Sequence, residues 1–254
     1  MLRYSKAFFH ALLDSIKDGY TYYSASLTYQ FLMVLGSLFM LLSFLASYLP
    51  FLQADRVVHY VLSLMPQHAE KVLARVLRIY EGRLSGSIIA LFLSYTFSVF
   101  FAKSLNRSFE FVYGERLKKK ELTFWLGVPL FLVFYTLALS ILLILLSISK
   151  PLFGAIYQRI VELSNLLVGL LSLYMLYGAF LGFKINTLKT ALLSSLLLFL
   201  LNKAFALVVV KTLTLNPLYT LFGSLIAFLV WLNLTFYCLL LGVRFFSHLD
   251  KPLQ

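Results

Sequence analysis

The side chains best suited to hold a ligand are cations and amides that lie inside long apolar stretches. Asn202 and Lys203 lie well inside residues 191–210, and Asn233 lies inside residues 218–241. A charge at bilayer depth costs about 3 kcal/mol or more, and such a residue usually faces protein, water or a ligand. We predict that Lys203, together with Asn202 and Asn233, binds an anionic group. The alternative is that the long side chain of Lys203 reaches the outer surface of the membrane.

Lys103 and Arg107 form a second cationic feature, where the apolar stretch 84–101 ends. With Glu110 they are spaced four and three residues apart, so all three share one face of a helix. They would form either a salt-bridged helix terminus or a polar mouth that receives an anionic headgroup. We include Lys103 and Arg107 in the predicted ligand-binding set.

Catalytic and metal-binding patterns are not found in the sequence. The histidines are scattered, with no spacing typical of metal ligands, at positions 10, 59, 68 and 248. No Ser-His-Asp or Cys-His arrangement and no glycine-rich phosphate loop can be proposed either. We therefore expect no enzymatic activity, no catalytic residues, no metal and no cofactor, and any transport would not be powered by ATP bound to this chain.

Six stretches have about the 20 apolar residues that a helix needs to cross a bilayer. They are residues 28–49, 84–101, 122–148, 163–183, 191–210 and 218–241. The chain is 61% hydrophobic and 13% charged, which excludes an ordinary soluble domain. These features predict an all-α, polytopic membrane protein with six transmembrane helices plus amphipathic interfacial helices, in one membrane domain over residues 1–254. The single cysteine, Cys238, excludes a disulfide framework within the chain.

Two further segments have an amphipathic pattern. Residues 1–19 predict a helix with one apolar and one basic face, which lies either in the membrane interface or against its own bundle. Residues 50–83 predict an outer loop with a basic amphipathic helix, which either covers the bundle or gates a cavity. Gly178 and Gly182 form a small-xxx-small pair, typical of close helix packing and weak evidence for a dimer.

The net charge of +12 points to anionic lipid headgroups rather than to nucleic acid, because the basic residues gather at the ends of apolar stretches. Lys and Arg are more numerous on the side that holds both termini and residues 118–120. This bias predicts that the N- and C-termini are cytoplasmic.

Three segments resemble the YihY/BrkB family of bacterial inner-membrane proteins. They are SASLTYQFLMVLGSLF at 24–39, LNRSFEFVYG at 105–114 and FGSLIAFLVW at 222–231, the last followed by Leu241-Gly242. The resemblance implies a six-span helical bundle in the inner membrane of the cell envelope. The chain departs from the family at Met40, commonly proline, at Phe222, commonly tyrosine, and at Arg244, where a glutamate is usual. A proline-glycine pair is also missing near residues 190–191.

Two functions agree with these patterns. The first is a transporter or flippase-like protein for anionic lipids or amphiphiles in envelope lipid traffic. The second is a non-transporting scaffold of the envelope, with protein partners. Some members of the YihY/BrkB family were once labelled ribonuclease BN. The missing metal-ligand pattern disfavours a nuclease function for this chain. We expect membrane phospholipids as partners and no nucleic acid, and we leave homo-oligomerisation open.

Overall fold

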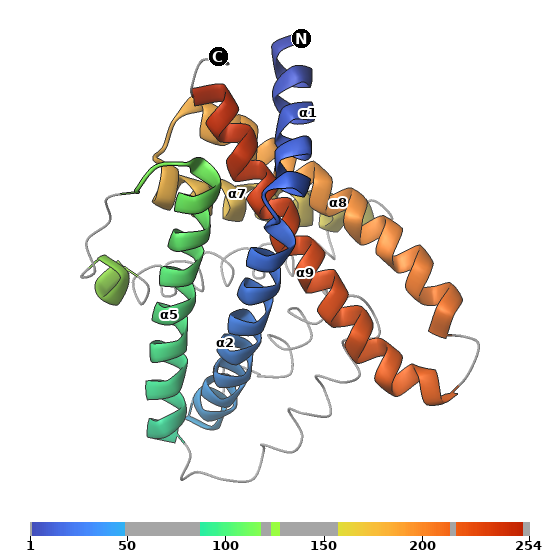
Figure 1. Ribbon diagram of the computed structural model, residues 1–254. Helices are drawn as coiled ribbons and strands as arrows, with labels where there is room; N and C mark the ends of the chain where they lie inside the picture. Colours follow the sequence, from blue (N-terminus) through green and yellow to red (C-terminus); the bar gives the residue numbers. More distant parts are fainter. Residues whose placement is uncertain (1, 49–86, 118–122, 128–156, 214–216, 251–254) are drawn as a thin grey trace. The chain divides into compact units, whose positions relative to one another are not determined.

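The computed structural model describes residues 2–48, 87–117, 123–127, 157–213 and 217–250, and their regular secondary structure is entirely helical (Figure 1). The helices are α1 (Leu2–Lys17), α2 (Tyr20–Tyr48), α5 (Ser87–Tyr113), α7 (Tyr157–Leu181), α8 (Ile185–Leu213) and α9 (Pro217–Asp250). Residues 123–127 form a further helical segment. The predicted all-helical class is confirmed.

Five of the predicted apolar stretches coincide with helices α2, α5, α7, α8 and α9. The observed helices are longer than the stretches because polar residues continue them; α5, for example, runs through Lys103 and Arg107 to Tyr113. Within the described residues, Ile185–Leu207 and Ile226–Asp250 are long and apolar enough to cross a membrane, and Leu166–Leu181 is apolar but shorter. Only residues 123–127 of the predicted span 122–148 are described, and the predicted outer loop 50–83 lies outside the described residues.

Glycine ends three of the helices. Gly19, Gly114 and Gly182 follow α1, α5 and α7 and have φ angles of 65°, 79° and 92°. This left-handed conformation strains residues that carry a Cβ, and it is common directly after a helix. The Gly114 and Gly182 amides then donate to the carbonyls of Glu110 and Gly178, which closes the last turn of each helix.

The described helices divide between two compact units. Unit 1 contains α1, α5 from Leu105 onward, α7, α8 as far as Phe199, and α9 from Leu240 onward. Unit 2 contains α2 and the remaining parts of α5, α8 and α9. Three helices therefore contribute residues to both units.

In unit 1, α1 packs through small side chains against the last part of α9. Ala7 and Ala11 are fully buried and form a cluster with Phe245 and Leu249. Alanine allows two helix backbones to approach closely, so a short helix gains a tight contact without large side chains.

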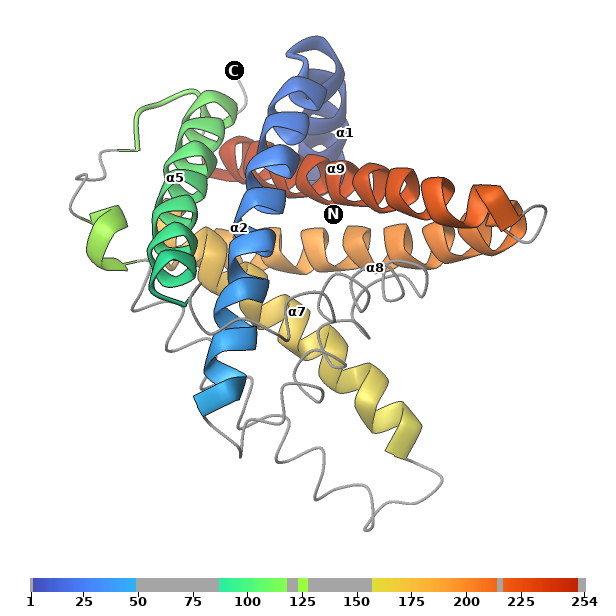
Figure 2. The same cartoon turned by 90° about the horizontal axis from the view of Figure 1, so that it is seen from below.

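In unit 2, an aromatic cluster joins three helices. Phe31 of α2, Phe101 of α5 and Phe236 of α9 lie with ring centroids 5.5–5.8 Å apart, two of the three pairs edge to face. Such aromatic pairs add about 0.5–1.5 kcal/mol beyond the burial of their area. Helices α2 and α5 lie near one another in both views (Figure 1 and Figure 2).

Candidate functional site

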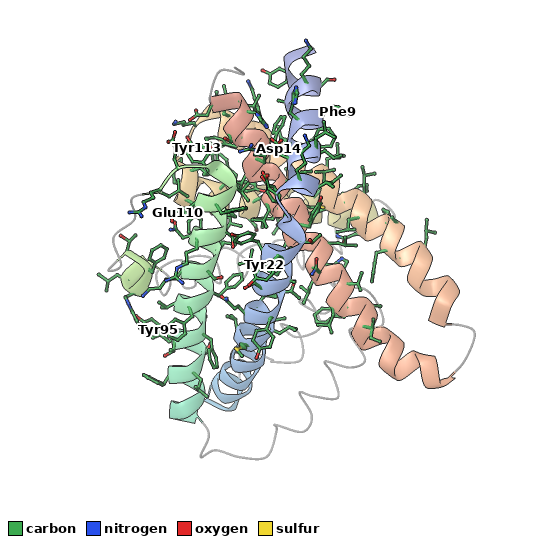
Figure 3. All side chains as sticks on the ribbon, viewed as in Figure 1. Phe9, Asp14, Tyr22, Tyr95, Glu110 and Tyr113 are labelled. Carbon is green, nitrogen blue, oxygen red and sulfur yellow. The ribbon has the colours of Figure 1, made fainter. Side chains whose placement is uncertain are left out.

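Two basic side chains of α9 converge on one carboxylate of α1 in unit 1. Arg244 Nε and His248 Nε2 each lie 2.9 Å from Asp14 Oδ2. All three side chains are partly buried. We call Asp14, Arg244 and His248 the Asp14 cluster; Figure 3 labels Asp14 on α1.

The sequence of α1 explains why a short aspartate can reach α9. Ala7, Ala11 and Ser15 are spaced by four residues and lie on one helix face, and all three are buried. Asp14 is on the edge of that face. Because the face carries only small side chains, α9 comes near enough for the carboxylate of Asp14 to meet Arg244 and His248.

The electrostatics keep Asp14 ionised. Burial alone would raise the pKa of its carboxyl, but the hydrogen bonds and charges of Arg244 and His248 outweigh burial and hold this pKa below its ordinary value of 3.8. At neutral pH the cluster therefore contains a carboxylate that accepts from both side chains, and charge-assisted bonds of this kind are stronger than neutral ones.

A second polar group lies where α5 and α9 end. Tyr113 Oη donates to Asp250 Oδ2 at 3.2 Å, and Lys184 Nζ lies 3.3 Å from both oxygens of the same carboxylate. Burial and the nearby charge of Asp250 raise the pKa of the Tyr113 hydroxyl, so it stays a donor. We call Asp250, Tyr113 and Lys184 the Asp250 cluster.

Side chains of α9 also satisfy the carbonyls that remain unpaired at the end of α5. Arg244 Nη1 donates to the Val112 carbonyl oxygen at 3.2 Å, and Ser247 Oγ donates to that of Tyr113 at 3.3 Å. The last carbonyls of any helix need partners outside it. Arg244 thus connects α1 and the end of α5 to α9.

The described contacts of these clusters join helices to one another. His248 contacts Asp14 and the ring of His10, so among the described contacts no hydroxyl or thiol completes a catalytic triad. Ser15 and Ser247 donate to backbone carbonyls. Within the described part of the chain, no group of three His, Cys, Asp or Glu side chains could hold a metal ion.

A close helix approach lies beside these clusters in unit 1. Tyr177 Oη and Ser194 Oγ share a buried hydrogen bond of 2.8 Å between α7 and α8. A Cβ atom on Gly242 of α9 would overlap both oxygen atoms. Glycine at this position lets α9 pack directly over the Tyr177–Ser194 bond.

The predicted small-residue pair of α7 has a role within the chain. The ring of Phe183 occupies the space that a Cβ on Gly178 would need. Gly182, the other member of the pair, lies at the turn that follows α7. The surface beside Gly178 is therefore filled by Phe183 of the same chain.

The two predicted amides have separate partners in unit 2. Asn202 Oδ1 accepts from Trp231 Nε1 at 2.6 Å, and Asn233 Oδ1 accepts from Ser24 Oγ at 2.9 Å. Lys203 is exposed, four residues from exposed Phe199 and exposed Leu207. This position on an apolar face agrees with the alternative in which its side chain reaches the membrane surface.

The predicted cationic pair of α5 divides between the units. Lys103 is partly buried and belongs to unit 2, whereas Arg107 is exposed and belongs to unit 1. Glu110 accepts a hydrogen bond of 2.9 Å from Asn106. The ligand-binding role of Lys103, Arg107, Asn202, Lys203 and Asn233 stays a prediction.

Sequence reasoning missed both clusters. Asp14 was visible only as a polar residue of an amphipathic helix, and Arg244 only as a departure from a family pattern. A signal that could have indicated Asp14 is its place beside Ala7 and Ala11, because small side chains allow another helix to approach closely.

A sequence model of the virulence factor BrkB family matches residues 12–251. The chain belongs to the virulence factor BrkB family. The resemblance predicted from the sequence is thereby confirmed, and the BrkB match includes every residue of the Asp14 and Asp250 clusters. No curated protein and no solved structure matches this BrkB-family chain.

Proposed function

We propose that this BrkB-family chain is a six-span protein of the bacterial inner membrane that binds anionic lipids and moves them, as a transporter or flippase-like protein of envelope lipid traffic. The observation that carries the proposal is a cation within an exposed apolar face of α8. Lipid handling needs both an apolar surface and a cationic position for the headgroup.

The exposed face of α8 has the composition of a lipid contact. Its large apolar side chains recur at helical spacing and are 41–68% exposed, at Leu188, Leu192, Leu196, Phe199 and Leu207. A continuous apolar face of this kind is unfavourable in water and is typical of an interaction site or a membrane contact. Ile185–Leu207 is also one of the stretches long enough to cross a membrane.

Lys203 lies on this same face, between Phe199 and Leu207. A lysine in an apolar setting extends its ammonium toward the nearest polar layer, where the phosphate of a lipid headgroup would pair with it. In the proposed topology, Lys103 and Arg107 meet headgroups at the cytoplasmic surface and Lys203 meets them near the opposite one. A crossing headgroup would then find a cation at each end of its path.

Reconstitution tests this proposal. In liposomes that contain a fluorescent anionic lipid, the wild-type protein should speed redistribution between leaflets, and Lys203→Ala and Arg107→Ala should each slow it. Arg116→Ala removes an exposed cation just after α5 and serves as the matched control. Native mass spectrometry should find anionic phospholipid retained by the wild type and less of it on Lys203→Ala. Redistribution no faster than in empty liposomes, with or without an ion gradient, would contradict the transport function.

The second candidate, a scaffold of the envelope, is favoured by one observation. The amides within the predicted spans that we assigned to a ligand each have a hydrogen-bond partner in the protein, Asn202 with Trp231 and Asn233 with Ser24. If the wild type retains no lipid and moves none, while Asn233→Ala loses stability, the amides act in helix packing and the scaffold function is preferred.

A further inference from the structure

We infer that the outer face of α1 is a docking surface for an anionic membrane interface, held at a fixed rotation by the contacts of α1 with α9. This inference rests on the proposed membrane location and adds a specific lipid-contact element outside the spans. The two alternatives left by the sequence, an interfacial helix and an arm packed on the bundle, then describe opposite faces of one helix.

The burial pattern divides α1 into two faces. Ala7, Ala11 and Ser15 are at most 1% exposed and face the protein. On the opposite side, Phe9, Leu12 and Ile16 are 59%, 38% and 67% exposed, and their spacing of three and four residues places them in one line. Figure 3 labels Phe9 on this helix.

The charges of α1 select a negative partner. Lys6, His10 and Lys17 are exposed on one flank of the apolar line. Asp14 is the one acidic residue in the α1 sequence, and Arg244 and His248 occupy its carboxylate. The exposed charged side chains described on α1, Lys6 and Lys17, are therefore both basic. An apolar line with a basic flank is the pattern of helices that lie in the headgroup region of anionic bilayers.

The contacts of α1 with α9 fix which face points outward. The Ala7–Ala11 side packs on Phe245 and Leu249, and Asp14 is bound by two side chains of α9. A rotation of α1 that buried the apolar line would break the Asp14 cluster and replace alanine with bulky side chains at a close approach. The outer face is therefore presented constantly rather than only after binding.

Spin labels can test the inference on the full chain in nanodiscs. Single cysteines replace Leu12, Ile16 or Lys17 in a Cys238→Ser background, and collisions with oxygen and with a water-soluble nickel chelate are compared. Labels at positions 12 and 16 should favour oxygen, and the label at position 17 should favour nickel. A label at Leu196, on the exposed face of α8, is the control for the membrane location itself.

Charge dependence forms the second part of the test. The label at position 16 should lie deeper in nanodiscs that contain phosphatidylglycerol than in pure phosphatidylcholine, and Lys6→Glu should remove that difference. Arg116→Glu, an exposed cation outside α1, should leave the difference unchanged.

The outcomes separate this inference from the proposed membrane location. Oxygen access at position 196 with nickel access at position 16 would overturn the role of α1 and leave the location intact. Nickel access at both positions would overturn both. A label at position 16 that neither reagent reaches, with dipolar broadening between copies, would show that a second chain covers the face and would also overturn the inference.

Discussion

Asp14 is the residue on which the attachment of α1 depends. Its carboxylate accepts from Arg244 and His248, and loss of the carboxylate leaves Arg244 Nε and His248 Nε2 without this acceptor in a partly buried place. We predict that Asp14→Ala lowers the free energy of unfolding by about 1–3 kcal/mol. Thermal unfolding in detergent, followed by tryptophan fluorescence, measures the change.

Two variants control the Asp14 prediction. Asp18→Asn changes an exposed acid just beyond α1 and should have little effect. The exchange Asp14→Arg with Arg244→Asp should recover part of the loss, because it restores an opposite-charge pair. An exchange variant no more stable than Asp14→Ala would indicate that the pair itself contributes nothing.

Gly242 lies at a position of unit 1 that has no room for a Cβ atom. An added methyl group would overlap Tyr177 Oη and Ser194 Oγ, and overpacking of this kind typically costs about 1–3 kcal/mol. We predict that Gly242→Ala is destabilised by that amount in detergent unfolding. Gly169→Ala in α7 is the matched control, because a Cβ there meets no atom within 4 Å and alanine favours a helix.

A further substitution tests whether overlap with Ser194 causes the expected destabilisation of Gly242→Ala. Ser194→Ala removes one of the two atoms that the methyl group would meet, so Gly242→Ala combined with Ser194→Ala should be less destabilised than the sum of the single variants. Strict additivity would show that the overlap with Ser194 is not what limits this position.

The attachment of helix α1 to α9 should depend on pH in the acid range. The pKa of Asp14 is lower in the folded chain than its ordinary value of 3.8, so the carboxylate contributes stability above that value. This contribution is lost as the pH falls through the folded pKa, below about 4. Mobility of a spin label at position 16 should rise there in the wild type.

Two variants, Asp14→Asn and Asp18→Asn, show whether Asp14 causes this pH dependence. Asp14→Asn carries no titrating group at this position, so its label should show little acid-induced change between about pH 5 and 3. Asp18→Asn should follow the wild-type profile. If Asp14→Asn and the wild type release α1 over the same pH range, a group other than Asp14 controls the attachment of α1 to α9.

The helices were easier to predict from the sequence than the contacts between them. Apolar runs about as long as a bilayer crossing predicted α2, α5, α7, α8 and α9, because a lipid-like setting leaves the helix as the main way to pair backbone groups. Helix ends were misplaced where polar residues continue the helix, as at Lys103 in α5. Apolarity alone does not mark the end of a helix.

The contacts of the candidate site could not be predicted, because they join distant residues. Asp14 and Arg244 are 230 positions apart, and neither has a neighbour in sequence that points to the other. Asn202 and Asn233 likewise have hydrogen-bond partners far along the chain, Trp231 and Ser24, and the sequence did not indicate these contacts. A single sequence contains the polar residues but not their pairing.

The topology of the whole molecule in the membrane can be tested directly. We predict that both termini and residues 115–121 are cytoplasmic, because Lys and Arg are more numerous on that side. Reporter fusions at the C-terminus and within 115–121 should give cytosolic signals, and a fusion at residues 67–68 should give an external one. A cytosolic signal from residue 68 would contradict the six-span assignment.

The ion clusters of unit 1 agree with one polar surface at this side. The Asp250 cluster joins the end of α5, the start of α8 and the end of α9, and the Asp14 cluster adds α1. In the proposed topology all of these helix ends lie at the cytoplasmic surface, where ionised groups keep access to water. In that topology, the charges lie where a membrane protein exposes them at the least cost.

Unit 1 also has a consequence for the order of biosynthesis. It needs α1, made before the other described helices, and the last part of α9, made after them, since Asp14 pairs with Arg244 across 230 positions. At about 5–20 residues per second, the ribosome takes roughly 12–46 s to supply Arg244 after Asp14 has been made. During that interval the nascent α1 carries its basic side chains and its apolar line without its partner helix. In the proposed membrane location, lipid headgroups are the surface that this helix meets until the end of α9 has been made.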